Sequence, residues 1–206
     1  MEVLSEQKKK IFEFRFQNVL RDEPMAKHTS FRVGGLARLY AVASTVNEMF
    51  EMVRCAQEER IPFAVYGGGS NLLVADEGFE GVVIQTGMRA ITVNDNEITA
   101  EAGAITGMVA RKSVEAGLGG FEWAVGVPGT IGGAVYGNAG CYGGEMKDAV
   151  VSVEAIRLSD LCKVVLTNKE CGFGYRSSFF KKEPHLILST TLRIETAADV
   201  EASKAR

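Results

Sequence analysis

The 23 glycines of this 206-residue chain are concentrated in a few segments, and this distribution limits what the chain can fold into. Glycine allows positive φ and leaves the backbone without a Cβ, at a cost in conformational entropy. No repeat period links the segments, which excludes a collagen or a solenoid. We therefore expect several loops to share one binding site, at which backbone comes close to a ligand. Most of the glycines lie in "YGGGSN" (66–71), "EAGLGG" (115–120), "GVPGTIGGAVYGNAGCYGGE" (126–145) and "CGFGYR" (171–176).

Composition narrows the class of protein. The chain is 46% hydrophobic with a net charge of -3, which gives no electrostatic reason to expect nucleic acid or an anionic membrane as partner. No apolar run approaches the roughly 20 residues of a membrane span, and the charged N-terminus is no secretory signal. We expect a cytoplasmic protein, whose oligomeric state the sequence does not predict. The four cysteines lie far apart and neither histidine clusters with them, so free thiols without a metal site are expected.

The first part of the chain has a β-α-β pattern. Helical spacing predicts a helix over 5–20 and another from Val46, capped by Ser44 or Thr45, between strands at 36–43 and 63–66. A further strand is expected at 81–87. "GGGSN" lacks the Lys-Ser/Thr ending of a P-loop, and its glycines follow the second strand instead of the first, where the Rossmann fingerprint has them. Neither common nucleotide-binding fold is supported, although bare N–H groups here suit an anion such as phosphate.

A second segment begins near residue 89. Alternation and turn residues predict a hairpin over 90–103, followed by a helix from Thr106 to Gly117. Strands are expected at 149–158, 163–167 and 185–194 from their β-branched content. The fold class is α+β, with an N-terminal helical segment (1–21), two subdomains (22–88 and 89–196) and the start of a linker helix (197–206).

Four motifs follow one another along the chain: "HTSFRVGG" (28–35), "YGGGSNLLV" (66–74), the stretch 126–145 and "FGYRSSFF" (173–180). In this order they resemble the MurB family, the UDP-N-acetylenolpyruvoylglucosamine reductases of bacterial wall synthesis. The resemblance covers nearly all of residues 22–196. It implies an FAD-binding fold of the vanillyl-alcohol-oxidase (PCMH) type, in which two α+β subdomains hold an extended FAD. It also implies reduction of UDP-N-acetylglucosamine enolpyruvate to UDP-N-acetylmuramate, with NADPH as hydride donor.

The resemblance also implies where FAD binds. Backbone of the first glycine loop should meet the FAD pyrophosphate, the start of the 126–145 stretch should close on it from the second subdomain, and Asn138 and Gly140 should lie close to the flavin. No His or Cys lies in the first loop, so FAD is expected to bind without a covalent bond. The expected FAD contacts are Tyr66, Gly67, Gly68, Gly69, Ser70, Asn71, Gly126, Pro128, Gly129, Thr130, Gly133, Asn138 and Gly140.

Two residues near these motifs are interpreted as structural. Cys141 stands where the family usually has alanine, and an inert buried thiol is favoured over a redox role. His28 could be taken for a catalytic base. It is expected instead to support the first strand of the FAD-binding part.

Arg176 is the residue expected to be catalytic. The implied reaction leaves negative charge on C2 of the substrate and its carboxylate, and a planar guanidinium can stabilise that charge with two hydrogen bonds. Tyr175 and Arg176 are expected to bind substrate, while Ser178 and Phe180 complete the Y-R-x-S-x-F pattern. The alternative is an exposed surface arginine beside two lysines.

Two other functions stay open, and one part of the family pattern is missing. The family takes the proton for C2 from a serine on a later loop and completes the site with a glutamate, and that serine's sequence context is absent here. The C-terminal substrate domain is therefore expected to be absent and the chain alone inactive. The alternatives are an FAD-dependent sugar or alcohol oxidase of the same fold and a non-catalytic flavin-binding module, which would not need "YRSSF".

Overall fold

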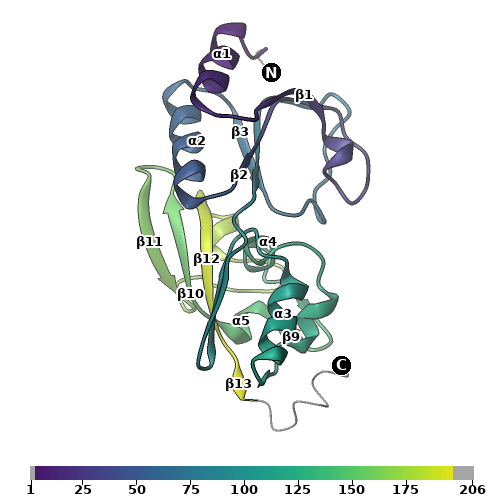
Figure 1. Cartoon of the computed structure of the whole chain (residues 1–206), viewed down its shortest axis with the longest axis vertical. Coiled ribbons are helices and arrows are strands. Elements are labelled where there is room, and N and C mark those ends of the chain that lie inside the picture. Colours follow the sequence, from purple (N-terminus) through teal and green to yellow (C-terminus); the bar gives the residue numbers. More distant parts are fainter. Residues whose placement is uncertain (1–2, 197–206) are drawn as a thin grey trace. The chain divides into compact units, whose positions relative to one another are not determined.

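The computed structural model describes residues 3–196 and divides the chain into two compact units, Met1–Met88 and Arg89–Arg206. Each unit has its own β-sheet structure (Figure 1). Each also has its own set of buried hydrophobic residues. The predicted linker helix at 197–206 lies outside the described residues. Within the described part, no helix combines the length and apolar character needed to cross a bilayer.

Unit 1 is built on a four-stranded sheet with the order β1-β2-β4-β3. Strand β1 is antiparallel to β2, whereas β2, β4 and β3 are mutually parallel. In the sheet, β4 lies between β2 and β3, the strands that precede and follow α2 in the sequence. The elements are α1 (Glu6–Arg15), β1 (Leu20–Pro24), the 3-10 helix η1 (Met25–Lys27), β2 (Leu36–Ala43), α2 (Val46–Glu58), β3 (Phe63–Tyr66) and β4 (Phe79–Thr86).

The predicted strands and α2 of unit 1 are confirmed, but the first helix is shorter than expected. Helix α2 begins where Thr45 Oγ1 accepts a hydrogen bond from Glu48 N at 3.1 Å, which satisfies one of the free N–H groups of the first turn. Met49 and Val53 are fully buried and α2 packs on β2 and β4. Helix α1 ends at Arg15 because Phe16 already has an extended backbone (φ -127°, ψ 137°), and the left-handed Asn18 (φ 57°) then turns the chain towards β1.

Unit 2 contains an antiparallel five-stranded sheet with the order β11-β10-β12-β6-β5, and two shorter two-stranded sheets, β7-β13 and β8-β9. The predicted hairpin, helix and three strands are confirmed, with Asp95 (φ 51°) in the hairpin turn and Gly117 (φ 77°) after the helix. The elements are β5 (Ile91–Asn94), β6 (Glu97–Glu101), α3 (Thr106–Glu115), β7 (Leu118–Gly119), η2 (Glu122–Gly126), α4 (Ile131–Tyr136), β8 (Gly140–Cys141), β9 (Gly144–Glu145), α5 (Met146–Ala149), β10 (Val150–Arg157), β11 (Cys162–Thr167), η3 (Phe179–Lys181), β12 (His185–Arg193) and β13 (Glu195–Thr196).

The glycine-rich stretch 126–145 is more regular than the sequence suggested. It forms α4 and the β8-β9 hairpin, although glycine disfavours helices. Tertiary contact explains α4: Ile131 N donates to Ala104 O and Gly132 N to Ala102 O, each at 2.9 Å. A Cβ on Gly132 would lie 2.9 Å from the Ala102 Cβ, so only glycine lets the helix approach this closely.

Candidate functional site

In unit 1, the first glycine loop leaves the carboxyl end of β3, the end at which open α/β sheets usually bind ligands. Polar side chains of the sheet fix its start. Tyr40 Oη donates to Gln85 Oε1 at 2.7 Å and lies 3.1 Å from Tyr66 Oη, and Gln85 Nε2 donates to Gly67 O at 3.3 Å. Burial raises the pKa of Tyr66, so its hydroxyl stays protonated.

The turn of this loop depends on Gly69. Its φ is +68°, and a Cβ there would overlap the carbonyl oxygen of His28. Ser30 N donates to Gly69 O at 3.0 Å, which ties the loop to the segment after η1. His28 itself stacks on Tyr40 with ring centroids 4.2 Å apart, and its Nε2 lies 3.0 Å from Glu23 Oε1. His28 therefore supports β1 and β2, as expected.

The next part of the loop offers free backbone donors. Gly68 and Asn71 are exposed, and neither makes a hydrogen bond within the described residues. Leu72 and Val74, which follow, pack against a core cluster that includes Met25 and Val83. The loop thus presents N–H groups to a ligand while its return limb is held in the core, an arrangement suited to an anion.

In unit 2, Thr130 carries a buried polar atom without a partner. Its Oγ1 makes no hydrogen bond to any described residue, and only 7% of the residue is exposed. Its neighbour Gly129 (φ +102°) accepts a bond from Thr106 N at 3.1 Å. Gly133 lies next to this hydroxyl, since a Cβ on Gly133 would be 3.7 Å from Thr130 Oγ1. An unsatisfied buried hydroxyl costs about 1–3 kcal/mol, which makes this atom a candidate ligand contact.

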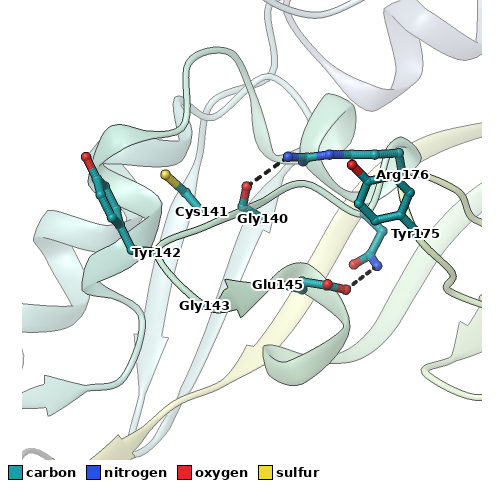
Figure 2. A pocket seen from close by; sticks show the side chains of 9 residues that line it. Gly140, Cys141, Tyr142, Gly143, Glu145, Tyr175 and Arg176 are labelled. Carbon is teal, nitrogen blue, oxygen red and sulfur yellow. Dashed lines mark hydrogen bonds between the residues drawn. The ribbon is translucent and has the colours of Figure 1, made fainter.

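A cavity of about 250 Å³ lies wholly within unit 2 (Figure 2). The β8-β9 hairpin forms one wall and the turn between Gly174 and Ser177 forms the other. The lining residues are Asn138, Gly140, Cys141, Tyr142, Gly143, Gly144, Glu145, Tyr175 and Arg176.

The hairpin wall has a tight two-residue turn. Tyr142 (φ 48°) and Gly143 (φ 87°) both have positive φ, the pattern of a type I′ turn. Tyr142 is 91% exposed at its tip. A Cβ on Gly140 would lie 2.7 Å from Gly144 O, so the two strands of the hairpin leave no room for a side chain there.

The opposite wall presents Arg176. Gly174 and Ser177 exchange two backbone hydrogen bonds of 3.0 and 3.1 Å, which places Tyr175 and Arg176 at the tip of the turn. Arg176 has a φ of +49°, and its Nη2 donates to Gly140 O at 3.2 Å across the cavity (Figure 2). The guanidinium carbon lies 5.9 Å from the centre of the Tyr175 ring.

The remaining residues of the Y-R-x-S-x-F pattern anchor this turn. Ser178 is 1% exposed and its Oγ donates to Tyr136 O, at the end of α4, at 2.7 Å. Phe180 is buried as well. The pattern therefore combines two exposed residues, Tyr175 and Arg176, with two buried anchors.

Asn138 makes hydrogen bonds to both walls of the cavity. Its Nδ2 donates to Glu145 Oε2 at 2.8 Å and to Gly174 O at 2.9 Å, and its Oδ1 accepts from Lys147 N at 3.0 Å. The ion pair with Lys147 and the bond from Asn138 lower the pKa of Glu145, which keeps this carboxylate ionised. Cys141, expected to be buried, is half-exposed beside them.

The structure thus brings some of the predicted site residues together. Asn138, Gly140, Tyr175 and Arg176 line one cavity, whereas the predicted residues 66–71 belong to unit 1. Gly126 is near the hairpin, since a Cβ there would lie 3.7 Å from the Tyr142 ring. The sequence reasoning missed Tyr142 and Glu145 as lining residues; the Tyr-Gly pair of the type I′ turn was the available signal. No cluster of metal ligands is found among the described residues.

Comparison with known proteins identifies the family. A profile described as "FAD binding domain" matches residues 37–160, more than half of the chain. The chain belongs to the FAD binding domain family. The predicted two-subdomain FAD-binding fold of the vanillyl-alcohol-oxidase type is thereby confirmed, and with it FAD as the cofactor that this family indicates.

The relatives of this chain include UDP-N-acetylenolpyruvoylglucosamine reductases, as the sequence motifs predicted. It is 40% identical over 183 residues to the UDP-N-acetylenolpyruvoylglucosamine reductase of Clostridioides difficile, covering 87% of this chain and 59% of that protein. The crystal structure of UDP-N-acetylenolpyruvylglucosamine reductase (MurB) from Thermus caldophilus matches with a TM-score of 0.78 at 32% identity, covering 92% of this chain and 66% of that one. The resemblance to this family is confirmed. The chain spans about three fifths of the length of the curated relatives.

A more distant neighbour shows the fold alone. An alkyldihydroxyacetonephosphate synthase matches with a TM-score of 0.67 at 14% identity, covering 95% of this chain and 42% of that one. The same FAD-binding fold therefore occurs in proteins with other reactions, so the reaction has to be argued from the site.

Proposed function

We propose that this chain is the FAD-binding part of a cytoplasmic UDP-N-acetylenolpyruvoylglucosamine reductase. The reaction would reduce UDP-N-acetylglucosamine enolpyruvate to UDP-N-acetylmuramate with NADPH, for peptidoglycan synthesis. The observation that carries this proposal is Arg176, which stands on a turn with a left-handed backbone at the edge of a cavity, within the predicted Y-R-x-S-x-F pattern. The similarity to reductases at about 40% identity supports the same reaction.

The first glycine loop fits the pyrophosphate of FAD. Gly68 and Asn71 have N–H groups that make no hydrogen bond to the described residues, and Gly69 keeps a Cβ out of the turn. Fixed backbone dipoles neutralise phosphate charge without a lysine. In unit 2, the partnerless hydroxyl of Thr130 can donate to an oxygen of the cofactor. When bound, FAD supplies the reducing equivalents that it receives from NADPH.

Arg176 would stabilise the negative charge that develops on the substrate carboxylate and C2. Its bond to Gly140 O uses one of the five N–H groups of the guanidinium. A carboxylate can therefore be held at two points, and the permanent positive charge lies next to the atoms that become negative. Tyr175 is 88% exposed beside the guanidinium and is proposed to contact the substrate.

Replacing Arg176 tests this proposal. Because relatives are longer than this chain, the assay should use the longest natural polypeptide that contains it. We expect Arg176→Ala to leave FAD bound and to lower kcat by about a hundred- to a thousandfold, since it removes charge stabilisation in the transition state. Arg176→Lys should restore only part of the rate, because a point charge cannot provide the two-point contact. A near-normal rate in Arg176→Ala would contradict the proposed mechanism, and failure to bind FAD at all would overturn the cofactor assignment.

A further inference from the structure

We propose that Asn138 is a positioning residue for Arg176, acting through the turn that carries it. The inference rests on the proposed function, because it assigns the role of Asn138 to the reaction of Arg176. It differs from the sequence-based expectation, which placed Asn138 next to the flavin. The side-chain amide of Asn138 makes all of its hydrogen bonds to residues of unit 2.

Asn138 has little contact with solvent, and its side-chain amide makes three hydrogen bonds. Only 2% of the residue is exposed, and its backbone is left-handed, with a φ of +43°. Both N–H groups of Nδ2 are used, on Glu145 Oε2 and Gly174 O, and Oδ1 accepts from Lys147 N. The amide is thus committed to neighbouring segments, which is the environment of a residue that fixes geometry.

These bonds close a ring around the cavity. From Asn138, one bond reaches Gly174 at the base of the turn, and Arg176 at the tip donates to Gly140 O. Gly140 pairs with Glu145 in the β8-β9 hairpin, and Glu145 accepts the second bond from Asn138. Asn138 is the member of the ring that links the base of the Arg176 turn to the hairpin.

The Arg176 turn needs such support. A non-glycine residue at a φ of +49° is strained relative to a relaxed backbone, and it persists only when surrounding contacts hold it. The Arg176 carbonyl also accepts a bond from Lys181 Nζ at 2.8 Å, but Lys181 is exposed. Asn138 itself is only 2% exposed, so its part-buried bond to Gly174 O is the stronger of these two constraints, because exposed polar contacts compete with water.

Asn138→Asp is the sharpest test. Aspartate keeps the shape and tolerates a left-handed backbone, but it replaces both donors with an acceptor that faces the Glu145 carboxylate and the Gly174 carbonyl. The matched control is Asn168→Asp, because Asn168 Nδ2 also bridges two carbonyls, Lys147 O at 2.8 Å and Val150 O at 2.7 Å, without touching the turn.

Two readouts separate positioning from general stability. In residues 1–206 without cofactor, hydrogen exchange of the Ser177 amide, which donates to Gly174 O, should become at least about tenfold faster in Asn138→Asp but not in Asn168→Asp. In the longest natural polypeptide, Asn138→Asp should lower kcat at least about tenfold with KM changed less than about twofold. In an Arg176→Ala background, the same substitution should cost less than about twofold in kcat, since its effect passes through Arg176.

The outcomes are distinct. Unchanged exchange at Ser177, or a loss of kcat that is fully additive with Arg176→Ala, would overturn the inference and leave the proposed function intact. A normal kcat in Arg176→Ala alone would refute the catalytic role of Arg176 and with it this inference, whereas no reduction of the enolpyruvyl substrate by the unchanged polypeptide would refute the proposed function itself. If Asn138→Asp does not fold, Asn138→Ser, which adds no charge and is too short to bridge both acceptors, replaces it in every measurement. Failure of both to fold would overturn the inference, because Asn138 would then support the whole unit.

Discussion

Gly69→Ala should destabilise unit 1 strongly, although it adds a single methyl group. Gly69 has a left-handed backbone, and the new Cβ would overlap the His28 carbonyl oxygen. Since backbone lies on the other side of this contact, no side chain can rotate away to make room. The loop has to move, and the bond from Ser30 N to Gly69 O is lost with it.

The expected magnitude is about 2–3 kcal/mol. A left-handed alanine costs about 1–2 kcal/mol relative to glycine. Loss of one backbone hydrogen bond adds about 0.5–1.5 kcal/mol. For a domain whose total free energy of unfolding is about 5–15 kcal/mol, this is a large fraction.

Urea unfolding of the FAD-free chain measures this loss. With a slope of about 1–3 kcal/mol per molar, the midpoint of the unit 1 transition should fall by about 1–2 M. Gly68→Ala is the matched control, because Gly68 is exposed and does not have a positive φ. Its midpoint should stay close to that of the unchanged chain. Equal midpoints for the two variants would refute the reasoning about Gly69.

Three further predictions concern the cofactor and the cavity. Gly68→Val places a β-branched side chain on the exposed part of the glycine loop, so FAD affinity should fall at least tenfold, about 1.4 kcal/mol, while the far-ultraviolet circular dichroism spectrum stays native. An unchanged FAD titration would show that this loop does not contact the cofactor. Thr130→Val removes the buried hydroxyl that lacks a partner, so the free energy of unfolding of the FAD-free chain in urea should rise by about 1 kcal/mol, while FAD should bind several times more weakly. Unchanged FAD affinity would show that Thr130 does not contact the cofactor. Lys147 and Asn138 lower the pKa of Glu145 from 4.5, so the contribution of its carboxylate to stability is present above pH 4.5 and is lost as pH falls through the lowered pKa. The amide chemical shift of Gly174 should therefore be constant from pH 7 to 4.5 and change only below pH 4.5. A change near neutral pH would contradict this assignment.

Local sequence signals predicted most of the regular structure. Helix α2 combines a threonine cap with helical spacing of Met49 and Val53, and the β5-β6 hairpin has turn residues between alternating apolar positions. In each case the signal is contained in a short window of sequence. Strand β1 and helix α4 were missed because their stability comes from distant partners, β2 for the first and the chain at Ala102 and Ala104 for the second.

The sequence predicted which segments carry the candidate site, but not the hydrogen bonds that arrange them in space. The Y-R-x-S-x-F pattern predicted that Arg176 matters, and the structure gives the physical reason that Ser178 and Phe180 accompany it, since both are buried anchors of the turn. The three bonds of Asn138 could not be predicted, because they join residues 138, 145, 147 and 174, whose proximity depends on the fold of unit 2. A pattern of residue types cannot distinguish a side chain that touches a ligand from one that holds its neighbour.

The position of β4 between β2 and β3 has a consequence for the order in which unit 1 assembles. Strand β3 is an edge strand of four residues and pairs with β4, which is synthesised after it. The glycine loop connects these two strands, so during translation it emerges before the strand that fixes its far end. Pairing of parallel strands across such a connection is slow compared with local helix formation. The far end of the glycine loop is therefore fixed only after Thr86 has left the ribosome and β4 has inserted beside β3, which makes the final geometry of this loop a late product of the folding of this unit.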